Sequence, residues 1–129
     1  MTMYGFKKSL AMPFETVREK IIDALKKEGF GILTEIDIKA KFKEKLGIDF
    51  KKYIILGACN PSYAHRAILA EEDIGLLLPC NIIVYEKDNG TVLAIIKPKV
   101  AMQMVHNELL GGLADDVETK LEKVFNSIL

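Results

Sequence analysis

The sequence has no tryptophan, two cysteines among 129 residues, and no excess charge of either sign. Two cysteines do not form a disulfide framework, and a chain of this length buries enough apolar surface to fold without one. Lysine plus arginine equals aspartate plus glutamate at 18 each, so the formal net charge is zero. No overall positive field therefore attracts nucleic acid, and we expect no nucleic-acid partner.

Long hydrophobic runs are also missing. The longest, residues 74–84, is interrupted by Gly75, Pro79 and Asn81, and it is shorter than the roughly 18 residues that a membrane span requires. Residues 1–14 lack the basic segment and apolar core of a secretory signal. We therefore expect a cytoplasmic protein with reduced thiols and no membrane contact.

What the sequence does contain is a globular composition, half hydrophobic and 28% charged, which predicts a single domain over residues 1–129. Alternating or continuous apolar residues predict strands at 3–10, 30–38, 53–59, 82–86 and 91–97. The segment 53–59 is apolar throughout, which predicts a strand buried on both faces. Asn89-Gly90 predicts a type I′ hairpin between the last two strands.

Helical periodicity predicts an amphipathic helix from Pro13 to Gly29 and a short charged helix at 39–46 that Gly47 ends. A third helix begins after Asn60 with Pro61 in its first turn and ends near residue 73. The C-terminal segment carries an apolar helical stripe from residue 113 to 128, and Gly111-Gly112 is expected to form a turn before it. The fold class is α+β, with a mainly antiparallel or mixed sheet of about five strands covered by helices.

Two motifs contain both cysteines. The first is Gly57-Ala58-Cys59-Asn60-Pro61, and the second, Gly75-Leu76-Leu77-Leu78-Pro79-Cys80-Asn81, follows after a short helix. In each, a cysteine and an asparagine lie beside an apolar run at the expected end of a buried strand. We expect the two turns to meet at one rim of the sheet and to form the functional site.

Together with Val84-Tyr85-Glu86 and the lysine-rich segment 39–47, these motifs resemble the bacterial and archaeal family catalogued as domain of unknown function 302. The resemblance covers nearly the whole chain. It implies a compact α+β domain that is often the entire protein, and a homodimer as the assembly. It implies no established activity, and no cofactor is identified.

The first functional hypothesis is non-catalytic binding of a small anion at the start of the Pro61 helix. Free backbone amides at a helix N-terminus favour anions. The residues expected to contribute are Cys59, Asn60, Ser62, His65, Arg66, Cys80 and Asn81. The plainer alternative is an ordinary helix cap with solvated side chains.

The second hypothesis is a thiol-dependent enzyme or redox protein. A helix N-terminus lowers a thiol pKa, so Cys59 is the candidate nucleophile, His65 its candidate base and Cys80 a candidate resolving thiol. The alternative is that both cysteines are small buried hydrophobic residues.

The third hypothesis is metal or haem binding. Cys59, Cys80, His65 and His106 are the types of ligand that zinc prefers, although their spacing matches no zinc motif. Met102, Met104 and His106 would suit Cu(I) if their segment is a strand, because alternate residues then share a face. If the segment is helical, the three side chains diverge and the methionines are core residues.

Overall fold

The computed structural model describes residues 3–129 and contains one five-stranded antiparallel sheet. Its strand order is β1-β5-β4-β3-β2, with every neighbouring pair antiparallel. The strands are β1 (Gly5–Leu10), β2 (Gly31–Asp37), β3 (Tyr53–Cys59), β4 (Cys80–Lys87) and β5 (Gly90–Ile96). The predicted α+β class is confirmed, and the sheet is antiparallel rather than mixed.

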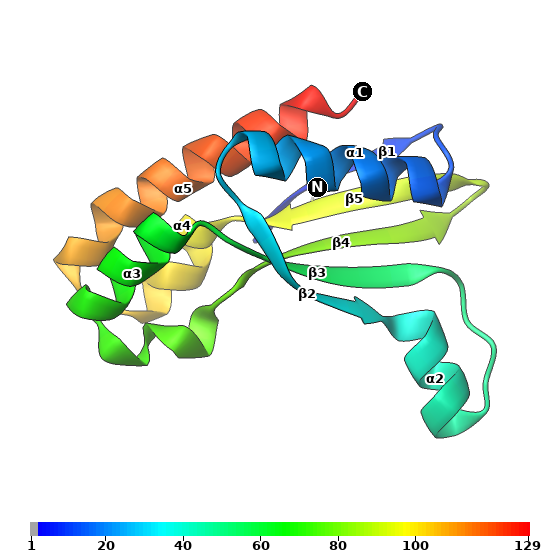
Figure 1. Cartoon of the computed structure of the whole chain (residues 1–129), viewed down its shortest axis with the longest axis horizontal. Coiled ribbons are helices and arrows are strands. Elements are labelled where there is room, and N and C mark those ends of the chain that lie inside the picture. The colour runs from blue at the N-terminus through cyan, green and yellow to red at the C-terminus, as the bar shows by residue number, and fades with distance from the viewer. Residues whose placement is uncertain (1–2) are drawn as a thin grey trace.

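Two long helices, α1 (Phe14–Lys27) and α5 (Glu108–Ser127), lie side by side on one face of the sheet (Figure 1). At one end of the sheet are α3 (Pro61–Ala70), the 3-10 helix η1 (Glu72–Leu77), α4 (Pro98–Ala101) and the 3-10 turn η2 (Met102–Met104). At the other end α2 (Ile38–Leu46) projects away from the body as an arm. None of the helices in residues 3–129 is long and apolar enough to cross a bilayer.

The hydrophobic core lies between the α1–α5 layer and the sheet. The apolar stripe of α1 is buried, with Val17, Ile21 and Leu25 fully shielded from solvent. They pack over alternate strand residues, among them Leu56 of β3 and Leu93 of β5. Burying one such side chain stabilises the fold by roughly 1.5–3 kcal/mol relative to leaving it exposed. The packing of this layer therefore holds the sheet against both helices.

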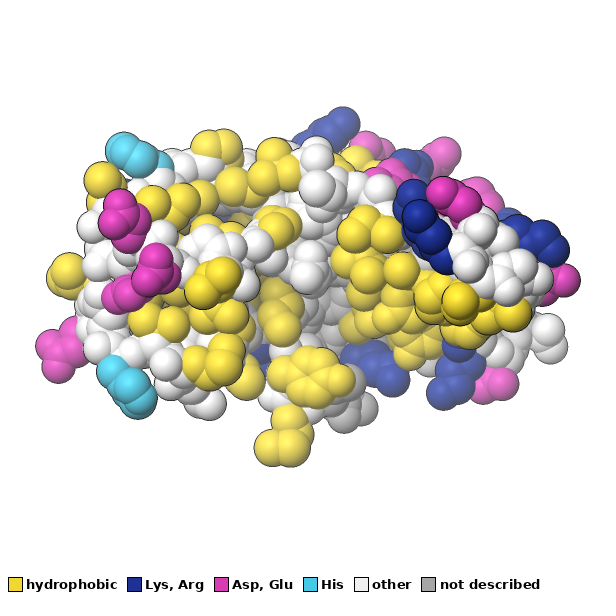
Figure 2. Space-filling view, turned by 90° about the horizontal axis from the view of Figure 1, so that it is seen from below, with side chains coloured by type: hydrophobic (Ala, Val, Ile, Leu, Met, Phe, Trp, Pro, Cys, Tyr) yellow, Lys and Arg dark blue, Asp and Glu magenta, His cyan; other side chains and the backbone are white. Residues whose placement is uncertain are grey.

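The opposite face of the sheet carries no helical layer in residues 3–129 (Figures 1 and 2). The prediction that β3 is buried on both faces is therefore wrong for the single chain. Ile54, Leu56 and Ala58 are buried, whereas Tyr53 and Ile55 on the other face are half-buried. We call this second surface the open face.

The hairpin between β4 and β5 differs from the prediction in its register. Lys87 pairs with Gly90, so the two loop residues are Asp88 and Asn89, and both have positive φ (51° and 64°). Aspartate and asparagine tolerate this region better than other residues with a side chain, so the two-residue turn forms without glycine in the loop. Gly90 is needed for another reason, since a Cβ there would lie 2.9 Å from the Leu10 carbonyl oxygen.

Two element boundaries were predicted wrongly. The helix that starts at Pro61 ends at Ala70, and η1 carries the chain on before β4 begins at Cys80. Gly111 and Gly112 lie inside α5 rather than in a turn before it. The reason is tertiary, because Asn107 caps the helix through Leu109 N–H and also donates to Ala70 O and Glu71 Oε1.

Gly57 of β3 allows the loop before β4 to pack against the open face. A Cβ on Gly57 would lie 2.7 Å from Pro79 Cγ and would overlap the Thr34 hydroxyl oxygen. Real Cβ atoms do not approach so closely, so residue 57 must be glycine for Pro79 to occupy this position. The contact fixes where β4 starts and therefore where Cys80 lies.

Replacing Gly57 by alanine is expected to destabilise the protein by about 1–3 kcal/mol, the usual cost of overpacking. The matched control is Gly31→Ala in β2, where a Cβ meets nothing within 4 Å; it is expected to be neutral or to stabilise by up to about 1 kcal/mol. Urea unfolding of both variants measures the difference. Equal stabilities would show that Pro79 does not depend on Gly57.

Candidate functional site

The structure brings the two cysteine turns together at one rim of the sheet. Ala58 at the end of β3 pairs with Cys80 at the start of β4, so Cys59 and Cys80 lie on adjacent strands. Successive strand residues point to opposite faces, which directs the Cys80 side chain toward the helices and the Cys59 side chain toward the open face. Both thiols are free, and this divergence disfavours a disulfide between them.

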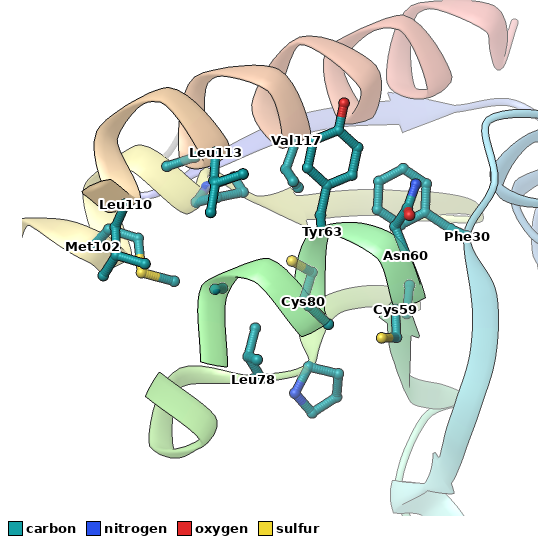
Figure 3. A pocket seen from close by; sticks show the side chains of 16 residues that line it. Phe30, Cys59, Asn60, Tyr63, Leu78, Cys80, Met102, Leu110, Leu113 and Val117 are labelled. Atoms are coloured by element: carbon teal, nitrogen blue, oxygen red, sulfur yellow. The ribbon is translucent and has the colours of Figure 1, made fainter. Parts of the chain in front are cut away.

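A small pocket lies at this rim between α3, α5, η2 and the ends of β3 and β4 (Figure 3). Its volume is about 60 Å³. Of the 16 residues in the described part of the chain that line it, none is charged. Its walls are apolar side chains, including Phe30, Leu78 and Leu113, and almost none of the lining surface is polar.

The predicted site residues divide into two groups. Cys59, Asn60 and Cys80 line the pocket. Ser62, His65 and Arg66 are exposed on the outer side of α3, and Asn81 is exposed on the open face. Because α3 turns Tyr63, Ala64 and Ala67 toward the pocket, the positions between them must point outward. Ser62, His65 and Arg66 therefore do not converge with the cysteines, whereas Asn60 does.

Asn60 occupies the N-cap position of α3, as predicted, but its side chain makes no capping hydrogen bond within the described chain. Its side-chain amide instead lies beside Gly29, which follows the end of α1. A Cβ built on Gly29 would be only 3.1 Å from Asn60 Nδ2. Arg66 likewise stays on the helix surface, with its guanidinium carbon 4.7 Å from the centre of the Tyr63 ring. Both side chains are therefore placed by contacts within the protein, and anion binding at this helix N-terminus stays a prediction.

Burial dominates the electrostatics of both thiols. It raises the pKa of Cys59 above its ordinary value. Burial, and to a smaller extent the neighbouring Cys59, raises the pKa of Cys80 to about 11. A nucleophilic cysteine needs a lowered pKa, so the shift runs against the thiol-enzyme hypothesis.

The metal hypotheses gain no support from the structure. Residues 3–129 contain no cluster of three or more histidine, cysteine, aspartate or glutamate side chains able to hold a metal ion, and Cys59, Cys80, His65 and His106 do not form one. Met102 to Met104 form a 3-10 turn instead of a strand. Met102 lines the pocket while Met104 is 68% exposed, so the predicted Cu(I) set diverges.

Four of the 16 residues that line the pocket come from α5 and were not predicted as site residues. Leu110, Leu113, Ala114 and Val117 of α5 line it, although they are more than 29 residues beyond Cys80. The stripe through Leu113 and Val117 was correctly identified as apolar. The sequence contained no signal that this part of the stripe faces a cavity instead of the sheet.

In the folded protein Cys80 is expected to resist alkylation, and Cys59 is expected to react slowly. The reaction rate of Cys59 should still rise with pH above about 8.5, which is the ordinary pKa of a thiol. Iodoacetamide labelling followed by peptide mass spectrometry measures both residues, and Cys59→Ser and Cys80→Ser assign the signals. After unfolding, both thiols should react equally. A Cys59 labelling curve that levels off below pH 8 would contradict the raised pKa.

Comparisons with known proteins agree with the fold and add no activity. Residues 6–128 match the sequence model described as "Domain of unknown function DUF302". The crystal structure of an uncharacterized conserved protein DUF302 from Bacillus stearothermophilus is similar over 99% of this chain and 100% of that chain, with 29% sequence identity and a TM-score of 0.91. The comparison with curated proteins found no match. The chain belongs to the DUF302 family.

Proposed function

We propose that the protein is a binding domain whose pocket takes a small, mainly apolar molecule, or the apolar end of an amphipathic one. The observation that supports this proposal is the uncharged lining of the pocket at the cysteine rim. Burying an unpaired charge among such residues is costly, whereas an apolar group entering the same space releases water from it. We propose binding rather than thiol catalysis, because burial raises the pKa of both cysteines.

The size of the pocket limits what enters it. An engineered cavity of about 150 Å³ holds benzene, and this pocket is less than half that volume at about 60 Å³. A short alkyl group therefore fits, and a larger ligand would leave part of itself outside. The polar part of such a ligand would lie outside the pocket, because almost none of the lining surface is polar.

The original hypothesis of an anion at the Cys59–Arg66 segment makes a different prediction. It requires the ligand to carry negative charge, whereas the pocket proposal requires an alkyl group. Three probes with four carbons each, 1-butanol, butyrate and butylammonium, separate the two requirements. Their affinities are expected to be about millimolar, which corresponds to roughly 4 kcal/mol for ligands of this size.

In the test, saturable shifts of methyl NMR signals from Leu78, Leu113 and Val117 are expected with 1-butanol. Ala67→Leu adds three carbons to the pocket wall and should weaken these shifts at least about tenfold by filling the space. Ala40→Leu on the exposed side of α2 is the matched control and should leave them unchanged.

Two results would count against the pocket. Binding of butyrate without 1-butanol would favour the anion hypothesis. Butanol shifts that persist in Ala67→Leu would place the alkyl group elsewhere.

A further inference from the structure

The open face carries a hollow that is separate from the cysteine pocket. Antiparallel register places Ile83 of β4 beside Ala94 of β5 on this face, with Ile96 two residues further along β5. Their side chains form an apolar floor that no helix of residues 3–129 covers, and Figure 2 shows this face from outside. The hollow over the floor has a volume of about 480 Å³, which lies in the usual range of small-molecule sites.

Aromatic side chains line the hollow beside this floor. They are Tyr4, Phe50, Tyr53 and Tyr85. The rings of Tyr53 and Tyr85 stack on each other with their centres 5.2 Å apart. Burial and, to a smaller extent, Tyr85 and Tyr4 raise the pKa of Tyr53, so the three phenol groups lie near one another. Phenol hydroxyls can donate hydrogen bonds to an anion at the edge of an apolar surface.

Three lysines also line the hollow, and no aspartate or glutamate does. They are Lys7, Lys51 and Lys87, and none of the three forms an ion pair within residues 3–129. Lys52, the next residue after Lys51, pairs instead with Glu15 of α1 on the helical side. Like charges around one hollow repel each other, so an anion placed among them would be stabilised.

Aromatic contacts hold Lys51 over the open face. Its Nζ lies 4.7 Å from the centre of the Tyr85 ring and 6.0 Å from that of Phe50. A cation–π contact positions an ammonium group without neutralising its charge. Lys7 lies at the other side of the floor, because it pairs with Ala94 across β1 and β5. The floor therefore has a positive charge on two sides.

The hollow suits a small molecule better than a nucleic-acid strand. Bases stack on free aromatic faces along a groove, whereas Tyr53 and Tyr85 cover each other and Lys51 lies over Tyr85. The formal net charge of the chain is zero, so no long-range field attracts a polyanion. A flat ligand can lie on strand side chains that share one side of a sheet.

We propose that the open face binds an organic anion with a flat apolar body, of the class of aromatic carboxylates. The ring lies on Ile83 and Ala94, and the carboxylate meets Lys7 or Lys51. The proposal is independent of what the cysteine pocket binds, since Cys80 and the α5 wall lie on the helical side of the sheet.

NMR of methyl signals with three naphthalene probes tests the proposal. Saturable shifts of Ile83 and Ala94 are expected with 2-naphthoate, with a dissociation constant of about 1 mM or lower. Uncharged 2-naphthol should bind at least about tenfold more weakly, and the cation 2-naphthylmethylammonium should give no saturable shift, because neither carries the charge that complements the lysines. Leu113 should not shift, since a naphthalene ring is too large for the cysteine pocket of about 60 Å³.

Substitutions locate the anion and the ring. Lys7→Gln/Lys51→Gln should weaken 2-naphthoate binding about tenfold through the loss of two charges. Lys20→Gln/Lys26→Gln is the matched control, because it removes the same charge from exposed positions of α1, and it should leave the constant unchanged. Ala94→Leu should abolish the Ile83 shifts by filling the hollow. The lysine variants change only side chains without ion pairs, so they test the site even where Ala94→Leu disturbs the sheet.

Three results would overturn the proposal. One is the absence of saturable shifts at Ile83 and Ala94, as when a second copy of the chain covers the face. Another is equal binding of 2-naphthol and 2-naphthoate, which would show that the lysines take no part. The third is displacement of 2-naphthoate by micromolar oligouridylate, which would assign the face to single-stranded nucleic acid.

Discussion

Burial of one face of the antiparallel sheet against α1 and α5 is the interaction on which the rest of the structure depends. It uses the alternate strand residues, such as Leu56 and Leu93, together with the apolar stripe of α1. Because both long helices lie on this side, the other face stays open. The open face exists because the described helices leave that side of the sheet uncovered, and the pocket lies at one end of the layer that covers the other side.

The pocket forms where α3, which is shorter than α1 and α5, packs beside the N-terminal half of α5. Ala64 and Ala67 leave space that larger residues would fill, and Pro79 holds the other wall in place through its contact with Gly57. The same apolar enclosure that leaves room for a ligand raises the pKa of Cys59 and Cys80. Space and thiol chemistry are therefore coupled: enclosure favours binding of apolar groups and suppresses nucleophilic reactivity.

Elements whose signals lie within a few neighbouring residues could be predicted from the sequence. The bounds of β3 and the end of α2 at Gly47, with φ of 67°, are examples. Features that depend on distant contacts could not. Asn60 has the sequence signature of a capping residue, but its side chain lies against Gly29. Asn107 caps α5 and donates a hydrogen bond to Ala70 O, so the helix begins before Gly111 and Gly112. The adjacency of the cysteines was inferred correctly from strand ends, whereas the α5 wall required the packed structure.

The central claim is that a small apolar space exists beside Cys80 and accepts an apolar guest. Xenon tests it most directly, because the atom is apolar, uncharged and known to occupy cavities of this kind. A crystal pressurised with xenon should show the atom among Ala67, Cys80 and Leu113. Absence of xenon there, or an ordered water in its place, would contradict the account.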